Sequence, residues 1–318
     1  LAILDGTTAG EGVDPLPNLD HKIVQGDALL SPLDWCTLGG DFQALTDDLK
    51  EVAALVADYA AADAQSKRGA RERLYDAHHR LSSSLLERAI ARNEAAQRGL
   101  RGALENTDLF GRTVAAPKVR AELVTLQRDL ERLEELARRA ALDGESASFS
   151  ACVQFAGVMR EGGFHLVVGN PPWVRIHGVP PGTRAQLRRG FETLRDCAWT
   201  AGGLLAGTKG FGSQPDLSVC FVEQSVRWLR RGGVLSMLVP SKLGRALYGA
   251  GVRRLLAEKA PPRTLIELGS DFFRGATTYP MGLVAKRGAV AVPVRVHTDL
   301  EGRGALVAPG SLHLVPGD

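Results

Sequence analysis

Between residues 45 and 140 the apolar positions recur every three or four residues, the spacing of one face of an α-helix. Glycines, prolines and polar residues separate two such stripes, and Glu134 and Glu135 precede Arg138 and Arg139 by four positions, a favourable helical order. The pattern predicts an antiparallel helical hairpin or a small bundle of two to four helices. The stripes consist of Leu45, Leu49, Val52, Val56 and Tyr59, and of Val119, Leu123, Leu126, Leu130, Leu133 and Ala137.

From residue 150 onward, runs of consecutive apolar residues alternate with amphipathic segments. The runs predict buried strands at Phe164–Gly169, 234–239, 265–268 and 282–285, and the segments 216–230 and 248–259 predict helices. Such an alternation is typical of an α/β fold with a mostly parallel sheet that is covered on both faces. Farther upstream, residues 22–25 predict a short strand that ends on a turn at Gly26 and Asp27.

Composition narrows the class of protein without naming a function. The 318 residues carry a net charge of +3, and the four cysteines are far apart, which argues against a zinc finger, a redox dithiol or a disulfide framework. His78 and His79 have no acidic partner at a metal-binding spacing, so no metal site is expected. There is no apolar run long enough for a membrane span and no secretory signal, which predicts a cytoplasmic protein without a membrane partner.

The strongest chemical signal is Asn170-Pro171-Pro172-Trp173, directly after the predicted strand that ends at residue 169. Ligands of open α/β sheets bind beyond the carboxyl ends of the strands. The Asn carbonyl can accept a hydrogen bond from an amino group, the two prolines stiffen the backbone that presents a main-chain carbonyl, and the Trp ring offers a face for stacking. These residues could therefore hold a planar ring with an exocyclic amino group; the plainer alternative is an Asn-capped turn with a packed Trp.

The segment 164–176 (FHLVVGNPPWVRI) resembles motif IV of the class I S-adenosylmethionine-dependent adenine-N6 DNA methyltransferases, and most closely their large restriction-modification and phage-defence type. Four other segments resemble further motifs of this family, so that the resemblance covers residues 16–35 and 160–290. In chain order they are 16–30, which resembles motif III, 216–221 (DLSVCF), 229–248 and 272–284 (FFRGATTYPMGLV).

This resemblance implies a Rossmann-like methyltransferase sheet, S-adenosylmethionine as cofactor and double-stranded DNA as partner. Asn170 and the carbonyl of Pro171, stiffened by Pro172, would bind N6 of a flipped-out adenine, and Trp173 would stack on the base. Phe272 or Phe273 would close its other face, unless they belong to the core. Asp27 matches the acidic residue of motif III that contacts the cofactor adenine.

Two intervals depart from the family pattern. Only 21 positions separate Gly6 from Asp27, too few for the strands and helices that carry the rest of the cofactor site, and the chain begins with Leu1 rather than Met. We therefore expect an N-terminally truncated domain whose first two strands are missing. The 143 positions between Asp27 and Asn170 hold the helical insertion. The predicted parts are 1–44 with the motif III strand, 45–148 as insertion, 149–290 as catalytic half, and 291–318 as a C-terminal region or linker.

The segment after the Asn170–Trp173 motif is rich in arginine, and Arg175, Arg184, Arg188 and Arg189 are candidate contacts to DNA phosphates, although an ordinary solvated loop would have the same composition. The predicted function is site-specific adenine methylation in a restriction-modification or phage-defence system, with other subunits or domains as possible partners. Two alternatives stay open: a protein-glutamine or RNA methyltransferase that uses the same amino-group site, and a non-catalytic DNA-binding subunit.

Overall fold

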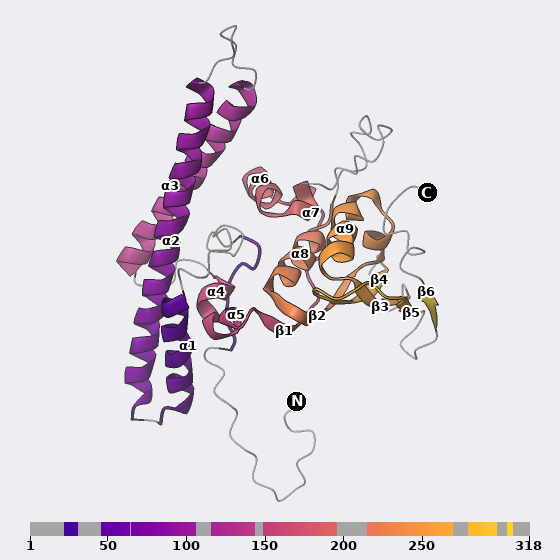
Figure 1. Ribbon diagram of the computed structural model, residues 1–318, viewed down its shortest axis with the longest axis horizontal. Helices are drawn as coiled ribbons and strands as arrows, with labels where there is room; N and C mark the ends of the chain where they lie inside the picture. The colour runs from indigo at the N-terminus through magenta and orange to yellow at the C-terminus, as the bar shows by residue number, and fades with distance from the viewer. Residues whose placement is uncertain are drawn as a thin grey trace, which may run out of the picture.

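The computed structural model describes residues 22–30, 46–63, 65–105, 116–143, 149–195, 215–269, 279–297 and 304–307. Figure 1 shows a long helical part beside a part that is built around one sheet, with two short helices between them. Among the described helices, none is long and apolar enough to cross a bilayer.

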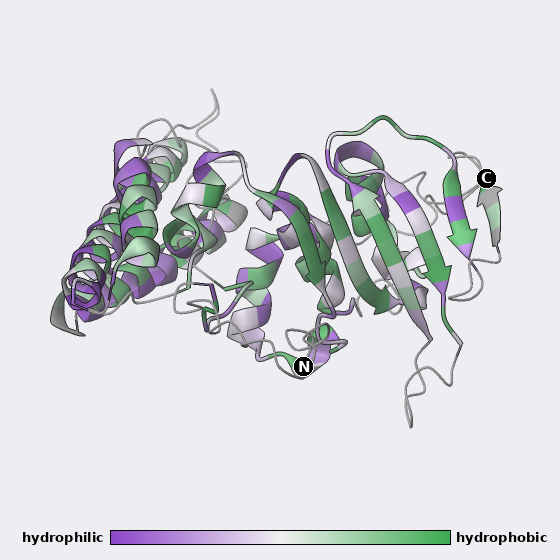
Figure 2. Cartoon of the chain, turned by 90° about the horizontal axis from the view of Figure 1, so that it is seen from below, coloured by the Kyte–Doolittle hydropathy of each residue, from purple (hydrophilic) through white to green (hydrophobic). Residues whose placement is uncertain are grey.

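Three helices form the helical part, here called the arm, and they confirm the predicted helical bundle. They are α1 (Thr46–Ala61), α2 (Lys67–Glu105) and α3 (Ala116–Asp143). Their apolar stripes meet in a narrow core that includes Leu49, Leu74, Leu85 and Leu133. The opposite helix faces carry charged side chains, as the hydrophilic colour of the arm in Figure 2 indicates.

Helices α4 (Ala151–Gln154) and α5 (Ala156–Arg160) connect the arm to the sheet. Val153 and Ala156 belong to the apolar core of the arm, whereas Cys152 and Met159 pack in a second cluster that includes Trp228 from the sheet part. Behind α5, Gly163 has a φ of +116°, and a Cβ atom there would lie 2.2 Å from the carbonyl oxygen of Trp228. Only glycine fits this turn, which leads directly into the first strand.

The sheet part, here called the sheet domain, contains six strands in the order β1-β2-β4-β3-β5-β6. The α/β class is confirmed, but the sheet is mixed rather than mostly parallel: β1–β2 and β3–β5 are parallel pairs, and the three other pairs are antiparallel. The reason is that β4 returns between β2 and β3 instead of extending the edge. The strands are β1 (Phe164–Gly169), β2 (Leu229–Pro240), β3 (Pro262–Glu267), β4 (Pro280–Lys286), β5 (Val294–His297) and β6 (Gly304–Val307).

Helices cover one face of this sheet in the described part of the chain. Residues Leu235, Met237 and Val239 of β2 are buried against α8 (Ser218–Trp228) and α9 (Ala250–Lys259), while the residues between them are only half-buried. The predicted cover on both faces is therefore not present among the described residues. The edge strand β1 makes this plain, because Leu166 and Val168 remain 55% and 68% exposed.

The predicted strand at residues 22–25 is absent: residues 22–30 form turns and bends without strand pairing. A strand needs a neighbour to complete its hydrogen bonds, and local sequence does not supply one. Leu29 and Leu30 nevertheless pack against the core of the sheet domain.

Candidate functional site

The Asn170–Trp173 segment begins where β1 ends. In the parallel β1–β2 pair, Gly169 is opposite Met237, so both strands finish at the same edge of the sheet. The Trp173 ring is half-buried, and its Nε1–H donates a hydrogen bond to the carbonyl oxygen of Leu238 in β2 at 3.4 Å. The position of the ring is thus determined by two strands at the carboxyl edge, where α/β sheets bind ligands.

The other residues of the segment differ in burial. Pro171 is buried, whereas Asn170 and Pro172 are exposed. A buried proline with a restricted φ fixes the direction of the backbone, and the exposed Asn170 amide remains accessible. The arrangement can present a side-chain carbonyl and an aromatic face to a planar ligand.

The backbone after Trp173 is anchored to the start of α8. The amide of Leu217 donates to the carbonyl of Val174 at 2.8 Å, and the amide of Ile176 donates to the carbonyl of Pro215 at 2.9 Å. Between these two bonds, Arg175 and Asp216 form an isolated antiparallel bridge. The chain therefore leaves the site along a defined path.

Asp216 belongs to this anchor and is the first residue of the DLSVCF segment, but no functional role was predicted for it. Its Oδ1 accepts a hydrogen bond from the amide of Ser218 at 2.9 Å, and the residue is buried. Burial raises the pKa of its carboxyl, although the bond from Ser218 and the positive charge of Arg175 oppose the shift. Burial, together with the negative charge of Asp216, also raises the pKa of Tyr248 to about 12. The DLSVCF segment was the available signal for Asp216, and the signal for Tyr248 was its place at the end of the segment 229–248.

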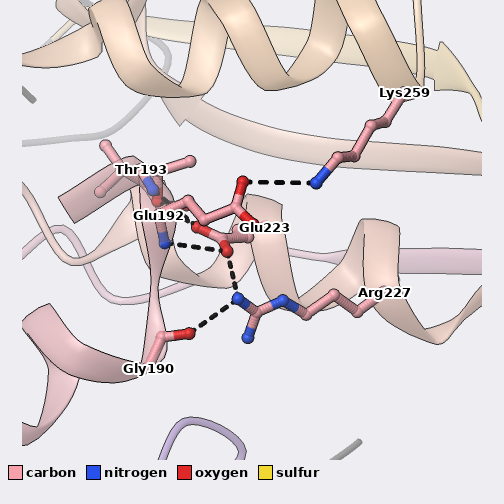
Figure 3. A network of polar contacts seen from close by, with 7 residues as sticks. Gly190, Glu192, Thr193, Glu223, Arg227 and Lys259 are labelled. Atoms are coloured by element: carbon pink, nitrogen blue, oxygen red, sulfur yellow. Dashed lines mark hydrogen bonds and ion pairs between the residues drawn. The ribbon is translucent and has the colours of Figure 1, made fainter. Parts of the chain in front are cut away.

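The buried carboxylate of Glu223, in the middle of α8, joins this helix to residues 190–193 (Figure 3). Glu223 accepts hydrogen bonds from the amides of Glu192 and Thr193 at 3.1 and 2.8 Å, and from the Thr193 hydroxyl at 2.7 Å. Arg227 forms an ion pair with Glu223 and also donates to the carbonyl of Gly190 at 2.7 Å. These contacts attach the end of α6 (Pro181–Gly190) and the start of α7 (Glu192–Arg195) to the sheet domain.

The four candidate phosphate contacts have different environments. Arg184 is half-buried and donates to the carbonyl of Val179 at 3.3 Å, which gives its guanidinium a structural contact. Arg189 pairs with Asp129 of the arm at 2.7 Å. Arg175 and Arg188 are exposed. Arg189 is exposed as well, so Arg175 and Arg188 differ from it in lying outside the ion pair with Asp129.

The predicted cofactor residue Asp27 lies in a turn and is exposed. Its Oδ1 accepts hydrogen bonds from the amides of Leu29 and Leu30 at 2.8 and 3.0 Å. Both of these bonds use the same oxygen, so the other carboxylate oxygen can accept a bond from a ligand. The predicted base-stacking residues Phe272 and Phe273 lie outside the described residues. Within the described ranges, no group of three or more His, Cys, Asp or Glu could hold a metal ion.

Two curated methyltransferases are similar in sequence to part of this chain. The chain is 26% identical over 137 residues to the Type II methyltransferase M.PaeR7I of Pseudomonas aeruginosa, covering 42% of this chain and 21% of that protein. It is 27% identical over 152 residues to the Type II methyltransferase M.XhoI of Xanthomonas vasicola, covering 47% and 25%. The chain therefore spans about a fifth to a quarter of the length of these curated relatives.

Among solved structures, the M protein of the type I restriction enzyme EcoKI matches with 21% identity and a TM-score of 0.28, over 42% of this chain and 25% of that one. A profile of one protein family matches residues 77–273, which is more than half of the chain and includes the Asn170–Trp173 segment. The chain belongs to the Eco57I restriction-modification methylase family.

Proposed function

We propose that this chain carries the target-base site of a DNA methyltransferase that transfers a methyl group from S-adenosylmethionine to N6 of adenine. The observation that carries the proposal is the Asn170–Trp173 segment at the carboxyl end of β1, with the Trp173 ring held by Leu238 of β2. Membership of a restriction-modification methylase family supports DNA as the substrate.

The chemistry assigned to the site follows from its groups. The Asn170 side-chain carbonyl and the Pro171 main-chain carbonyl each accept a hydrogen bond from one N–H group of the adenine amino group. These two bonds direct the nitrogen lone pair out of the ring plane. Trp173 stacks on the base, a contact worth about 1–3 kcal/mol. No strong base is needed in this arrangement, because alignment and hydrogen bonding prepare the nitrogen for attack.

S-adenosylmethionine, when bound, supplies the methyl group. Asp27 fits a role in holding the cofactor adenine, because its carboxylate is exposed, its Oδ1 is engaged with backbone amides, and a second oxygen is available to accept from an amino group. The backbone bonds fix the direction of the carboxylate, so Asp27 would orient the ligand rather than adapt to it.

The substrate adenine must leave the duplex, because N6 is hydrogen-bonded within a base pair. We assign the exposed Arg175 and Arg188 to the phosphates beside the flipped nucleotide, since both belong to the segment that leaves the base site. The protein would act on cytoplasmic DNA together with other domains or subunits of a restriction-modification system.

The test is N6-methyladenine in plasmid DNA from a methylation-deficient host that expresses the protein from its complete gene, measured by mass spectrometry. Asn170→Ala should lower methylation on the order of 100-fold or more, as expected for a group that stabilises a transition state. Trp173→Ala should weaken base capture, whereas Trp173→Phe should retain part of the activity because a flat apolar face remains.

Glu161→Ala, at an exposed residue after α5, is the matched control and should methylate as well as the parent. Undiminished methylation by Asn170→Ala would contradict the assignment of the site. Modified cytosine in the DNA, or methylated glutamine or RNA in place of methylated DNA, would contradict the proposed substrate.

A further inference from the structure

The arm touches the segment that follows the base site. Asp129 on α3 and Arg189 on the last turn of α6 form an ion pair at 2.7 Å, although they are 60 positions apart in the sequence. Their side chains are 29% and 40% exposed, so the pair lies at the surface and remains in contact with solvent. Figure 1 shows α6 on the side of the sheet domain that faces the arm.

Cations outnumber the single carboxylate at this junction. Arg132 lies three positions after Asp129, on the same face of α3, and its positive charge acts on that carboxyl. Arg188 precedes Arg189 in the last turn of α6, and Arg132 and Arg188 are both exposed. We call Arg132, Arg188 and Arg189 with Asp129 the junction cluster. Asp129 faces Arg189 and Arg132, and Arg188 is the sequence neighbour of Arg189, so the four residues together carry an excess of two positive charges.

The α6 part of the junction cluster is held at a fixed place relative to Asn170–Trp173. The chain between them is attached to the start of α8 by the bonds at Val174 and Ile176, and to its middle by Glu223 and Arg227. Movement of α6 would break the hydrogen bond from Arg227 to the carbonyl of Gly190, and movement of the adjoining α7 would break the bonds to the Glu223 carboxylate. The cations on α6 therefore keep a defined position relative to the base site, and the Asp129–Arg189 pair brings α3 beside them.

We propose that the junction cluster binds the phosphate backbone of the DNA duplex that carries the target base, so that the arm contributes directly to substrate binding. This inference rests on the proposed function for the identity of the duplex. Guanidinium groups suit phosphate because their planar donors can bind two oxygens at once. Asp129 orients Arg189 through an exposed ion pair, which is weak enough to exchange for a phosphate.

The first experiment measures binding of a short fluorescent DNA duplex of arbitrary sequence to the chain by anisotropy, over a range of salt concentrations. Arg132→Gln and Arg188→Gln should each weaken binding several-fold and reduce the slope of log K against log salt by about one unit. Arg138→Gln is the matched control on α3, because Arg138 is exposed and belongs to a different ion pair, with Glu135. It should leave the slope nearly unchanged.

A second variant tests the sign of the effect. Asp129→Asn removes the competing carboxylate and keeps a similar shape, so it should tighten binding of the same duplex and steepen its salt dependence. A purely structural ion pair predicts the opposite, because its loss would loosen α6 and leave binding unchanged or weaker. That result, or equal effects of Arg132→Gln and Arg138→Gln, would overturn the proposal.

Duplex binding is measured without methylation, so this inference and the proposed function can fail separately. Intact plasmid methylation with no change in binding by the junction variants would reject only the role of the arm. Reduced binding with methylation of cytosine would reject only the adenine assignment. Absence of duplex binding by the chain would overturn the junction cluster as a DNA contact.

Discussion

The arm keeps its ion pairs at the surface, whereas the sheet domain buries its strongest one. In the arm, Arg68 and Glu72 pair at 3.1 Å with side chains that are 91% and 66% exposed. In the sheet domain, the Glu223 side chain is 1% exposed, and its carboxylate also accepts three hydrogen bonds from the first two residues of α7. Surface pairs contribute little because water and salt screen them, while a buried charge requires its partners.

The arm and the sheet domain are therefore stabilised in different ways. The arm depends on periodic leucines along three helices, and its charges mainly keep the outer faces hydrated. The sheet domain has an apolar core of its own and adds a few specific polar contacts that join distant segments of the chain. We therefore expect single substitutions of polar residues to matter more in the sheet domain than in the arm.

The largest expected difference is between two glutamates. Glu223→Ala should destabilise the chain by about 3–5 kcal/mol, because it removes the acceptor of three hydrogen bonds from α7 and leaves the half-buried Arg227 without its ion-pair partner. Glu72→Ala in the arm should change stability by no more than about 0.5 kcal/mol. Urea denaturation of both variants measures the difference, and the double variant Glu223→Ala/Arg227→Met should regain part of the loss. Similar unfolding midpoints for the two single variants would contradict the comparison.

Replacing each of two glycines by alanine should change the stability of the chain in opposite directions. Gly163→Ala requires a non-glycine residue at a φ of +116° and places a Cβ against Trp228, so it should cost about 1–3 kcal/mol from the backbone strain alone. Gly99 lies inside α2, where an added Cβ would meet nothing within 4 Å. Gly99→Ala should therefore stabilise the arm by about 0.5–1 kcal/mol. Thermal unfolding followed by circular dichroism tests both signs, and a gain for Gly163→Ala would refute the turn assignment.

The smallest expected effect is on the pH dependence of stability. Burial raises the pKa of Asp216, so the folded chain holds this proton more tightly, and Asp216 makes folding less favourable as pH rises above the ordinary aspartate value of about 3.9. Glu135 in the arm has the opposite sign, because the bond from Arg139 and the charge of Arg138 lower its pKa. Its stabilising contribution is lost as pH falls.

As pH rises from acidic to neutral, the stability of Asp216→Asn relative to the parent should therefore increase. The stability of Glu135→Gln relative to the parent should decrease over the same rise in pH. The measurement is the urea midpoint of each variant at a series of pH values. Parallel pH profiles for the two variants would show that the environments of these carboxyls do not differ as described.

The sequence by itself determined the features that depend on neighbouring residues. The three-four spacing of leucines predicted the arm, because a helix repeats every 3.6 residues whatever surrounds it. Apolar runs located β1, β2, β3 and β4, and the Asn170–Trp173 segment was expected directly after a strand, where the structure has it. These signals are local, so a single sequence contains them.

Only the tertiary structure decided which segments meet. Glu223 reads as an ordinary charged residue on an amphipathic helix, yet it is buried because α7 approaches it from 30 positions away. The antiparallel return of β4 between β2 and β3, the exposed side chains of β1 and the absence of a strand at residues 22–25 also depend on long-range neighbours. Strand pairing and burial depend on contacts between distant residues, and hydrophobic periodicity contains no information about those contacts.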